Sequence, residues 1–149
     1  NIIDVFKLIA SKRMPFASRG DNSGTDIKEK LIWEKAQIKP KMFSGQWYLE
    51  TGSGMGSTIN VAIGMGGYTI SDRATWIKFG NKNDFKVLHE GDKLLFNQYG
   101  IMLINRKKCP MVKSELGLKF INWLLSKRGQ KIINSYKFNG MQLFFGNAD

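Results

Sequence analysis

The chain has 149 residues, of which 42% are hydrophobic and 12% aromatic, so it can bury a core and does not have a disordered composition. It carries 23 Lys and Arg against 12 Asp and Glu, and the net charge of +11 is compatible with a nucleic acid, an anionic membrane surface or a small anion as partner. One cysteine, Cys109, excludes an internal disulfide and a cysteine-type zinc site. No apolar run approaches the ~20 residues of a membrane-spanning helix. The sequence opens at Asn1 without an initiator methionine, which leads us to expect a portion of a longer protein.

Short helices and strands are predicted to alternate along the chain. Apolar spacing, capping residues and prolines predict helices over residues 2–13, 25–38, 57–65, 72–79, 114–125 and 130–136. Ser114 is expected to cap the fifth of these. Short apolar runs between turn residues predict strands at residues 15–18, 68–70, 86–89 and 99–104. This alternation favours an α/β fold with a mostly parallel sheet, and a change of composition at residues 92–97 is a candidate crossover between two lobes.

The richest cluster of polar residues is the octapeptide at residues 18–25, between a predicted strand and a predicted helix. The start of that helix offers unpaired backbone N–H groups and the positive end of the helix dipole. Arg19 adds a planar fork of donors that can bind two oxygens at once, and Asp21 is expected to pair with Arg19 and to fix its orientation. The candidate ligand-binding residues of this segment are Arg19, Asp21, Asn22, Ser23, Gly24 and Thr25.

The free energy available from hydrogen bonds at residues 18–25 is sufficient for an anion site. Charge-assisted hydrogen bonds contribute roughly 1.5–3 kcal/mol each, so four or five of them would sustain micromolar to nanomolar affinity after the cost of association. The alternative for this turn is a helix cap with a solvated arginine. A nucleotide-binding P-loop is excluded, because the Gly-x4-Gly-Lys-Ser/Thr spacing is absent.

A second glycine-rich segment precedes another predicted helix and presents either a further positive helix end or a plain capped turn. Its candidate residues are Gly54, Met55, Gly56 and Ser57. Arg73 is a further candidate, although pairing with Asp72 or an indirect role is favoured. His89 stands without Cys or Asp at metal-ligand spacing, so neither a metal site nor a Ser-His-Asp catalytic set is expected.

The octapeptide resembles the signature of the tungstate-binding proteins of ABC importers, which belong to the type II periplasmic-binding-protein superfamily. Further blocks of similarity extend the resemblance over nearly the full chain, at residues 47–58, 68–75, 96–101, 120–133 and 142–145. The resemblance implies a two-lobed clamp around a tetrahedral oxyanion, with residues 1–96 forming the second lobe and residues 97–149 returning to the first. It also implies that the anion contacts Arg19, Ser23, Gly24 and Thr25.

One residue departs from the family pattern. The family usually has His after Ser-Gly-Thr, whereas this sequence has Asp26. A carboxylate facing the anion would repel tungstate but would accept the proton of hydrogen phosphate, so a phosphate-binding protein is the alternative within the class. The favoured expectation is that Asp26 faces away from the anion in the first helical turn, where a negative charge suits the dipole.

The sequence therefore predicts an extracytoplasmic solute-binding component of an ABC transporter, periplasmic or lipid-anchored. It binds tungstate or molybdate, works with membrane permease subunits, and has no enzymatic activity, cofactor or metal. The alternatives are a basic nucleic-acid-binding domain and a regulatory module within a transcription factor. No interleaving of basic and aromatic residues supports nucleic acid as a partner. Because the resemblance implies that part of one lobe is absent, apolar residues at 99–104 and in the final helices are expected to drive self-association.

Overall fold

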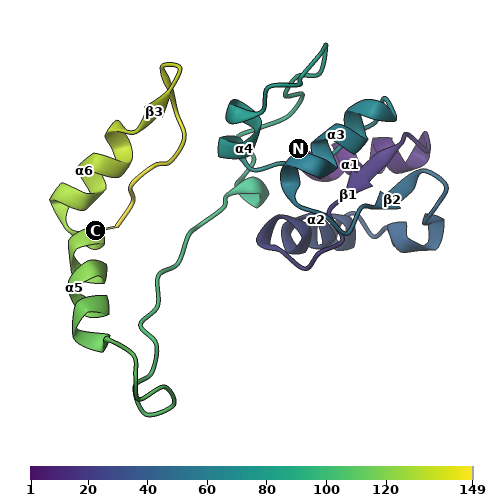
Figure 1. The fold of residues 1–149 in the computed structure, drawn as a ribbon. Coiled ribbons are helices and arrows are strands. Elements are labelled where there is room, and N and C mark those ends of the chain that lie inside the picture. The colour runs from purple at the N-terminus through teal and green to yellow at the C-terminus, as the bar shows by residue number, and fades with distance from the viewer. Residues whose placement is uncertain (149) are drawn as a thin grey trace. The chain divides into compact units, whose positions relative to one another are not determined.

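The computed structural model describes residues 1–148, which divide into two units, the first over Asn1–Asn97 and the second from Gln98 onward. Each unit has its own helices and strands (Figure 1). The assignment of residues 1–96 and 97–149 to two lobes of a binding protein stays a prediction.

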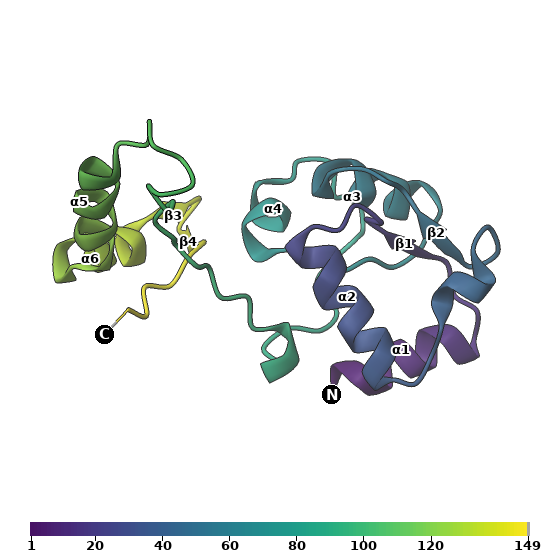
Figure 2. The ribbon, with the colours of Figure 1, turned by 90° about the horizontal axis from the view of Figure 1, so that it is seen from below.

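The centre of the first unit is a pair of parallel strands, β1 (Phe16–Ser18) and β2 (Tyr48–Glu50). In their register Phe16 lies opposite Tyr48 and Ser18 opposite Glu50. The strand predicted at 68–70 is reduced to one bridge, between Phe16 and Tyr68. The helices of this unit (Figure 2) are α1 (Ile2–Ser11), α2 (Gly24–Lys35), α3 (Met55–Gly64) and α4 (Arg73–Lys78), with two 3-10 helices, η1 (Pro40–Phe43) and η2 (Lys93–Leu95).

Side-chain caps begin three of the α-helices of this unit. Asn1, Ser23 and Asp72 each accept a backbone N–H in the first turn of α1, α2 and α4. The predicted helices at 2–13 and 25–38 end two and three residues too late, because Arg13 and Gln37 adopt left-handed φ angles of 50° and 60° that stop the helix. None of the helices in the described residues is long and apolar enough to cross a membrane.

The core of the first unit is aromatic. The ring centroid of Trp33 lies 4.3 Å from that of Phe6 and 5.3 Å from that of Phe16, and Tyr48 stacks on Phe16 at 6.0 Å. The indole N–H of Trp33 donates to Glu29 Oε1 at 3.0 Å, and the Tyr48 hydroxyl donates to the same oxygen at 2.8 Å. One buried carboxyl group therefore satisfies the polar atoms of two core aromatic residues.

The second unit consists of two helices and a small antiparallel hairpin. Leu143 is buried, whereas many other large apolar side chains of the unit are exposed, including Met102 at 88%, Phe120 at 56% and Trp123 at 42%. The elements are α5 (Ser114–Leu125), α6 (Lys127–Ser135), β3 (Lys137–Phe138) and β4 (Met141–Gln142).

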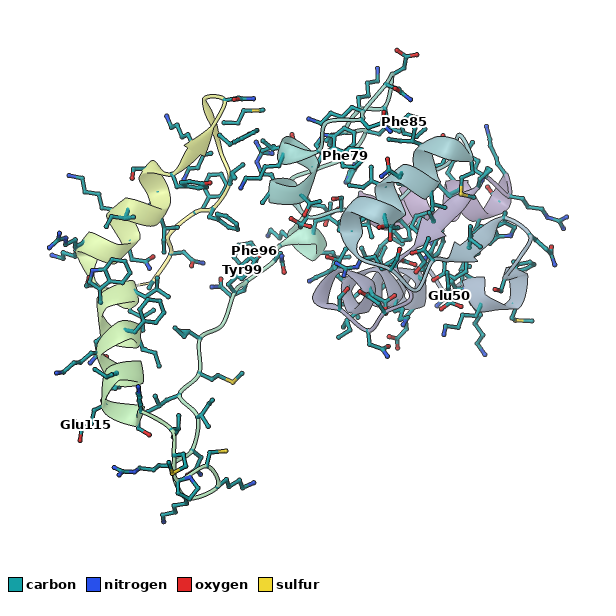
Figure 3. All side chains as sticks on the ribbon, viewed as in Figure 1. Glu50, Phe79, Phe85, Phe96, Tyr99 and Glu115 are labelled. Atoms are coloured by element: carbon teal, nitrogen blue, oxygen red, sulfur yellow. The ribbon has the colours of Figure 1, made fainter. Side chains whose placement is uncertain are left out.

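Two predicted strands and one predicted cap are wrong. Residues 86–89 and 99–104 have no regular secondary structure, because an apolar run forms a strand only beside a hydrogen-bonding neighbour and none pairs with them in the described residues. Tyr99, labelled in Figure 3, lies on the second of these stretches and is 66% exposed. Ser114 is the first residue of α5 rather than its cap, and the N-cap Lys113 makes no side-chain capping bond.

Candidate functional site

Both strands of the first unit run into a helix at the same edge of the pair. α2 follows β1 and α3 follows β2, and because the strands are parallel, both helix N-termini lie beyond the carboxyl ends of the strands. Thr51 ties the two exits together, since its N–H and its hydroxyl donate to the carbonyl oxygen of Ser18 at 2.9 and 3.1 Å. Thr51, three residues before the second glycine-rich segment, is therefore fixed to the end of β1, where the first segment begins.

The loop between β1 and α2 reverses direction through left-handed residues. Gly20 has a φ of 63° and Asn22 a φ of 58°. A Cβ at position 20 would lie 2.9 Å from the Cβ of Glu50 on β2, which is closer than side chains pack. Gly20 is thus required by both the backbone conformation and the neighbouring strand.

Asp21 holds Arg19 in place, as the sequence predicts. The Nη2 atom of Arg19 donates to Asp21 Oδ2 at 2.5 Å, and the side chains are only 18% and 23% exposed. The other oxygen of Asp21 accepts the N–H of Ser23 at 3.1 Å. Hydrogen bonding from the Ser23 side chain, with a further contribution from Arg19, lowers the pKa of Asp21 to about 2 despite partial desolvation. The carboxylate is therefore ionised at neutral pH, and the guanidinium fork beside it is pre-oriented.

Asp26 is fully buried and turns back onto the loop. It lies in the first turn of α2, as expected, and its oxygens accept the N–H groups of Gly20 at 3.1 Å and Asn22 at 3.0 Å. Lys30, one turn further along α2, pairs with it at 2.5 Å. The amides of Gly20, Asn22 and Ser23 are thus engaged within the loop, although Asn22 and Ser23 were both expected to face a ligand.

The first residues of α2 retain open donors. Among the described residues, no acceptor binds the N–H of Gly24 or Thr25, since a helix start has no intrahelical partners for them. Gly24 is exposed and has no Cβ. The Nε atom of Arg19 is buried and has no hydrogen-bond partner in the described part of the chain. Unpaired donors at a helix start suit an anion, and the binding of a ligand by Arg19, Gly24 and Thr25 stays a prediction.

The start of α3 contributes a second open helix end at this edge. Gly54 is the N-cap of α3 and provides no side-chain cap. Met55 is buried to 6% exposure, so only its backbone could face a ligand, and Ser57 is exposed. The parts that Gly54, Met55, Gly56 and Ser57 play in ligand binding stay predictions.

A hydroxyl network fastens this second helix start to the strands. The hydroxyl of Thr58, which is fully buried, lies 2.9 Å from Thr51 Oγ1 and donates to the Gly54 carbonyl at 3.1 Å. Ser53 donates to Thr51 Oγ1 at 3.0 Å. Neither Thr51 nor Thr58 was among the residues predicted to form the site. Thr51 directly follows a strand and Thr58 lies in the first turn of a helix, and these positions could have identified them.

The remaining candidates lie on other elements. Arg73, the first residue of α4, pairs with Glu90 at 2.8 Å, while Asp72 caps that helix at the N–H of Thr75. A direct contact of Arg73 with a ligand stays a prediction. His89 Nε2 lies 3.7 Å from Asp92, and no group of three or more potential metal ligands occurs in the described residues.

Two helix starts at one edge of a parallel strand pair, with an arginine held by a carboxylate, suit the capture of an anion without covalent chemistry. The chain belongs to the PBP superfamily, because the family model described as a PBP superfamily domain matches residues 2–128. The α/β periplasmic-binding-protein-like fold and the family resemblance predicted from the sequence are confirmed.

Several relatives of the chain are tungstate-binding proteins. It is 35% identical to the tungstate-binding protein TupA of Peptoclostridium acidaminophilum, over 99% of this chain and 51% of that protein. The structure of TupA from Desulfovibrio alaskensis G20 matches with 44% identity and a TM-score of 0.80, over 100% of this chain and 61% of that one. The structure described as the tungstate ABC transporter from Geobacter sulfurreducens matches with 42% identity and a TM-score of 0.80, over 91% and 56%.

The chain spans about half the length of the curated tungstate-binding relatives it matches. These relatives are named as binding proteins rather than enzymes.

Proposed function

We propose that the chain belongs to the solute-binding component of an ABC importer, which captures tungstate or molybdate outside the cytoplasmic membrane and delivers it to membrane permease subunits. The observation that carries the proposal is the donor set at residues 19–25. The open N–H groups of Gly24 and Thr25 share a short loop with a guanidinium that Asp21 holds in place. Binding of this kind needs hydrogen bonds and closure of a clamp, and no covalent step.

The loop favours a fully deprotonated oxyanion over hydrogen phosphate. A protonated oxyanion needs an acceptor for its O–H group. Asp21 uses one oxygen for Arg19 and the other for the N–H of Ser23, and both oxygens of Asp26 bind Gly20 and Asn22. Since both loop carboxylates are engaged, donors dominate the site, which supports tungstate or molybdate over the phosphate alternative.

The test is calorimetric titration of the complete natural protein with tungstate, molybdate, sulfate and phosphate. We expect Arg19→Ala to weaken tungstate binding at least tenfold, because a charge-assisted hydrogen bond contributes roughly 1.5–3 kcal/mol. Arg106→Ala is the matched control, since it removes the same charge from an exposed position in the second unit. The affinity of the Arg106→Ala variant for tungstate should stay within about twofold of the wild-type value.

Two results would count against the proposal. A wild-type protein that gives no binding heat with any tetrahedral oxyanion would exclude the function itself. Tighter binding of phosphate than of tungstate would replace the ligand and would show that a loop carboxylate accepts the phosphate proton.

A further inference from the structure

We propose that Asp26 is a positioning residue of the oxyanion loop and that, with Lys30, it decides which backbone amides remain open to the ligand. This inference rests on the proposed function, because it assigns a role within the same site. Asp26 itself contacts the loop backbone rather than the anion.

The argument begins with the shape of the loop. Gly20 and Asn22 are both left-handed, and their N–H groups converge on one carboxylate, with Gly20 on Oδ1 and Asn22 on Oδ2. Converging backbone N–H groups of this kind form a concavity that binds anions. In this protein an anion from its own chain fills the concavity, so the external ligand meets Arg19 and the start of α2 instead.

The buried charge of Asp26 is compensated. A carboxylate without solvent exposure is costly unless it is paired and hydrogen-bonded. Lys30 pairs with Oδ2 of Asp26 and also lies 3.4 Å from the side-chain oxygen of Asn22. The hydrogen bond to Asp26 raises the pKa of Lys30, so the ammonium stays charged and limits the repulsion between Asp26 and a bound dianion.

The same residue also shapes the other end of the turn. The backbone N–H of Asp26 donates to Ser23 Oγ at 3.4 Å, which completes the cap of α2. Asp26 therefore joins positions 20, 22 and 23 to the helix start that offers Gly24 and Thr25. We expect that loss of its carboxylate leaves the N–H groups of Gly20 and Asn22 without their acceptor. The loop would then no longer hold the donors of Arg19, Gly24 and Thr25 in one arrangement.

Substitution of Asp26 should produce a graded signature. Asparagine has one side-chain oxygen and can accept from only one of the two amides, whereas alanine accepts from neither. In the 15N-labelled complete natural protein, we expect Asp26→Asn to accelerate hydrogen exchange about tenfold at one of Gly20 and Asn22. Asp26→Ala should accelerate it at both. Lys35→Met on the exposed face of α2 is the control for Lys30→Met, and it should leave both amides unchanged.

Tungstate affinity of the same proteins completes the test. We expect it to fall at least tenfold in Asp26→Ala, less in Asp26→Asn and Lys30→Met, and not in Lys35→Met. Unchanged exchange at Gly20 and Asn22 in Asp26→Ala would overturn the inference, whatever the wild-type protein binds. Unchanged affinity despite faster exchange would also overturn it. A wild-type protein that binds no oxyanion would instead reject the proposed function, and this role with it.

Discussion

Glu29 is fully buried, as Asp26 is, but unlike Asp26 it has no cationic partner among the described residues. Oε1 accepts from Trp33 and Tyr48, whereas Oε2 and the neighbouring buried hydroxyl of Ser18 have no hydrogen-bond partner of good geometry among the described residues. Burial raises the pKa of Glu29 to about 7, and nearby donors from Ser18, Tyr48 and Trp33 only partly oppose the rise. The group therefore changes charge near neutral pH inside an aromatic core.

Stability should reflect this titration. Because the folded-state pKa is raised, the folded chain holds the proton more tightly than the unfolded chain. The contribution of Glu29 to the free energy of unfolding is complete below pH 4.5, the ordinary pKa of the group. It is lost as the pH rises through the folded-state pKa of about 7. We expect Glu29→Gln to remove up to roughly 3 kcal/mol of pH dependence from the free energy of unfolding.

Urea denaturation of the wild-type protein and Glu29→Gln at several pH values between 5 and 8 measures this difference. The two stability curves should converge toward acid pH and separate toward alkaline pH, with the variant more stable there. Parallel curves across the whole range would show that Glu29 does not titrate in the core.

Among the elements of the first unit, α2 and α3 both have a hydroxyl group that forms hydrogen bonds at the helix start, that of the N-cap Ser23 in α2 and that of Thr58 in the first turn of α3. Thr58 has no solvent exposure, and its hydroxyl joins α3 to Thr51, which in turn bonds the end of β1. We expect Thr58→Val to lower the free energy of unfolding by about 0.5–1.5 kcal/mol, because it removes the buried hydroxyl that bonds the Gly54 carbonyl and contacts Thr51. Ser57→Ala, at an exposed position of the same helix, should change it by less than about 0.5 kcal/mol. Chemical denaturation compares the two, and equal effects would contradict a structural role for the network.

Some features of the fold and the site could be predicted from the sequence and others could not, for physical reasons. The helix start predicted at residue 25 and the Arg19–Asp21 pair depend on local spacing, and both occur in the structure, with the helix beginning one residue earlier, at Gly24. The strand predicted at 99–104 depends on a distant partner that the described residues do not supply. The contacts of Asp26 with Gly20 and Asn22 depend on a backbone reversal, which spacing alone does not reveal.

At the scale of the whole molecule, apolar exposure is concentrated in the second unit. Phe120 and Trp123 stack on each other along α5 with ring centroids 5.9 Å apart, and both remain more than 40% exposed. Exposed patches of this type mark a surface that another protein segment covers. We expect the 149-residue chain to self-associate through this face, as the sequence also predicts.

Sedimentation velocity of the chain checks this expectation. The average mass should rise with concentration in the wild-type chain and fall toward the monomer in a double variant, Phe120→Gln with Trp123→Gln. Met42→Gln is the control, since Met42 is 73% exposed but lies in the first unit. A wild-type chain that stays monomeric at all concentrations would contradict the prediction.

The hydrogen bond between Trp33 and Glu29 gives the protein an internal optical probe. An indole that donates to a carboxyl group at 3.0 Å experiences a different electric field when that group gains a negative charge, and its emission wavelength shifts in response. Intrinsic fluorescence followed across neutral pH can thus report ionisation in the folded state, without an added dye. The shift should vanish in Glu29→Gln, which separates the signal of this one indole from those of the other tryptophans.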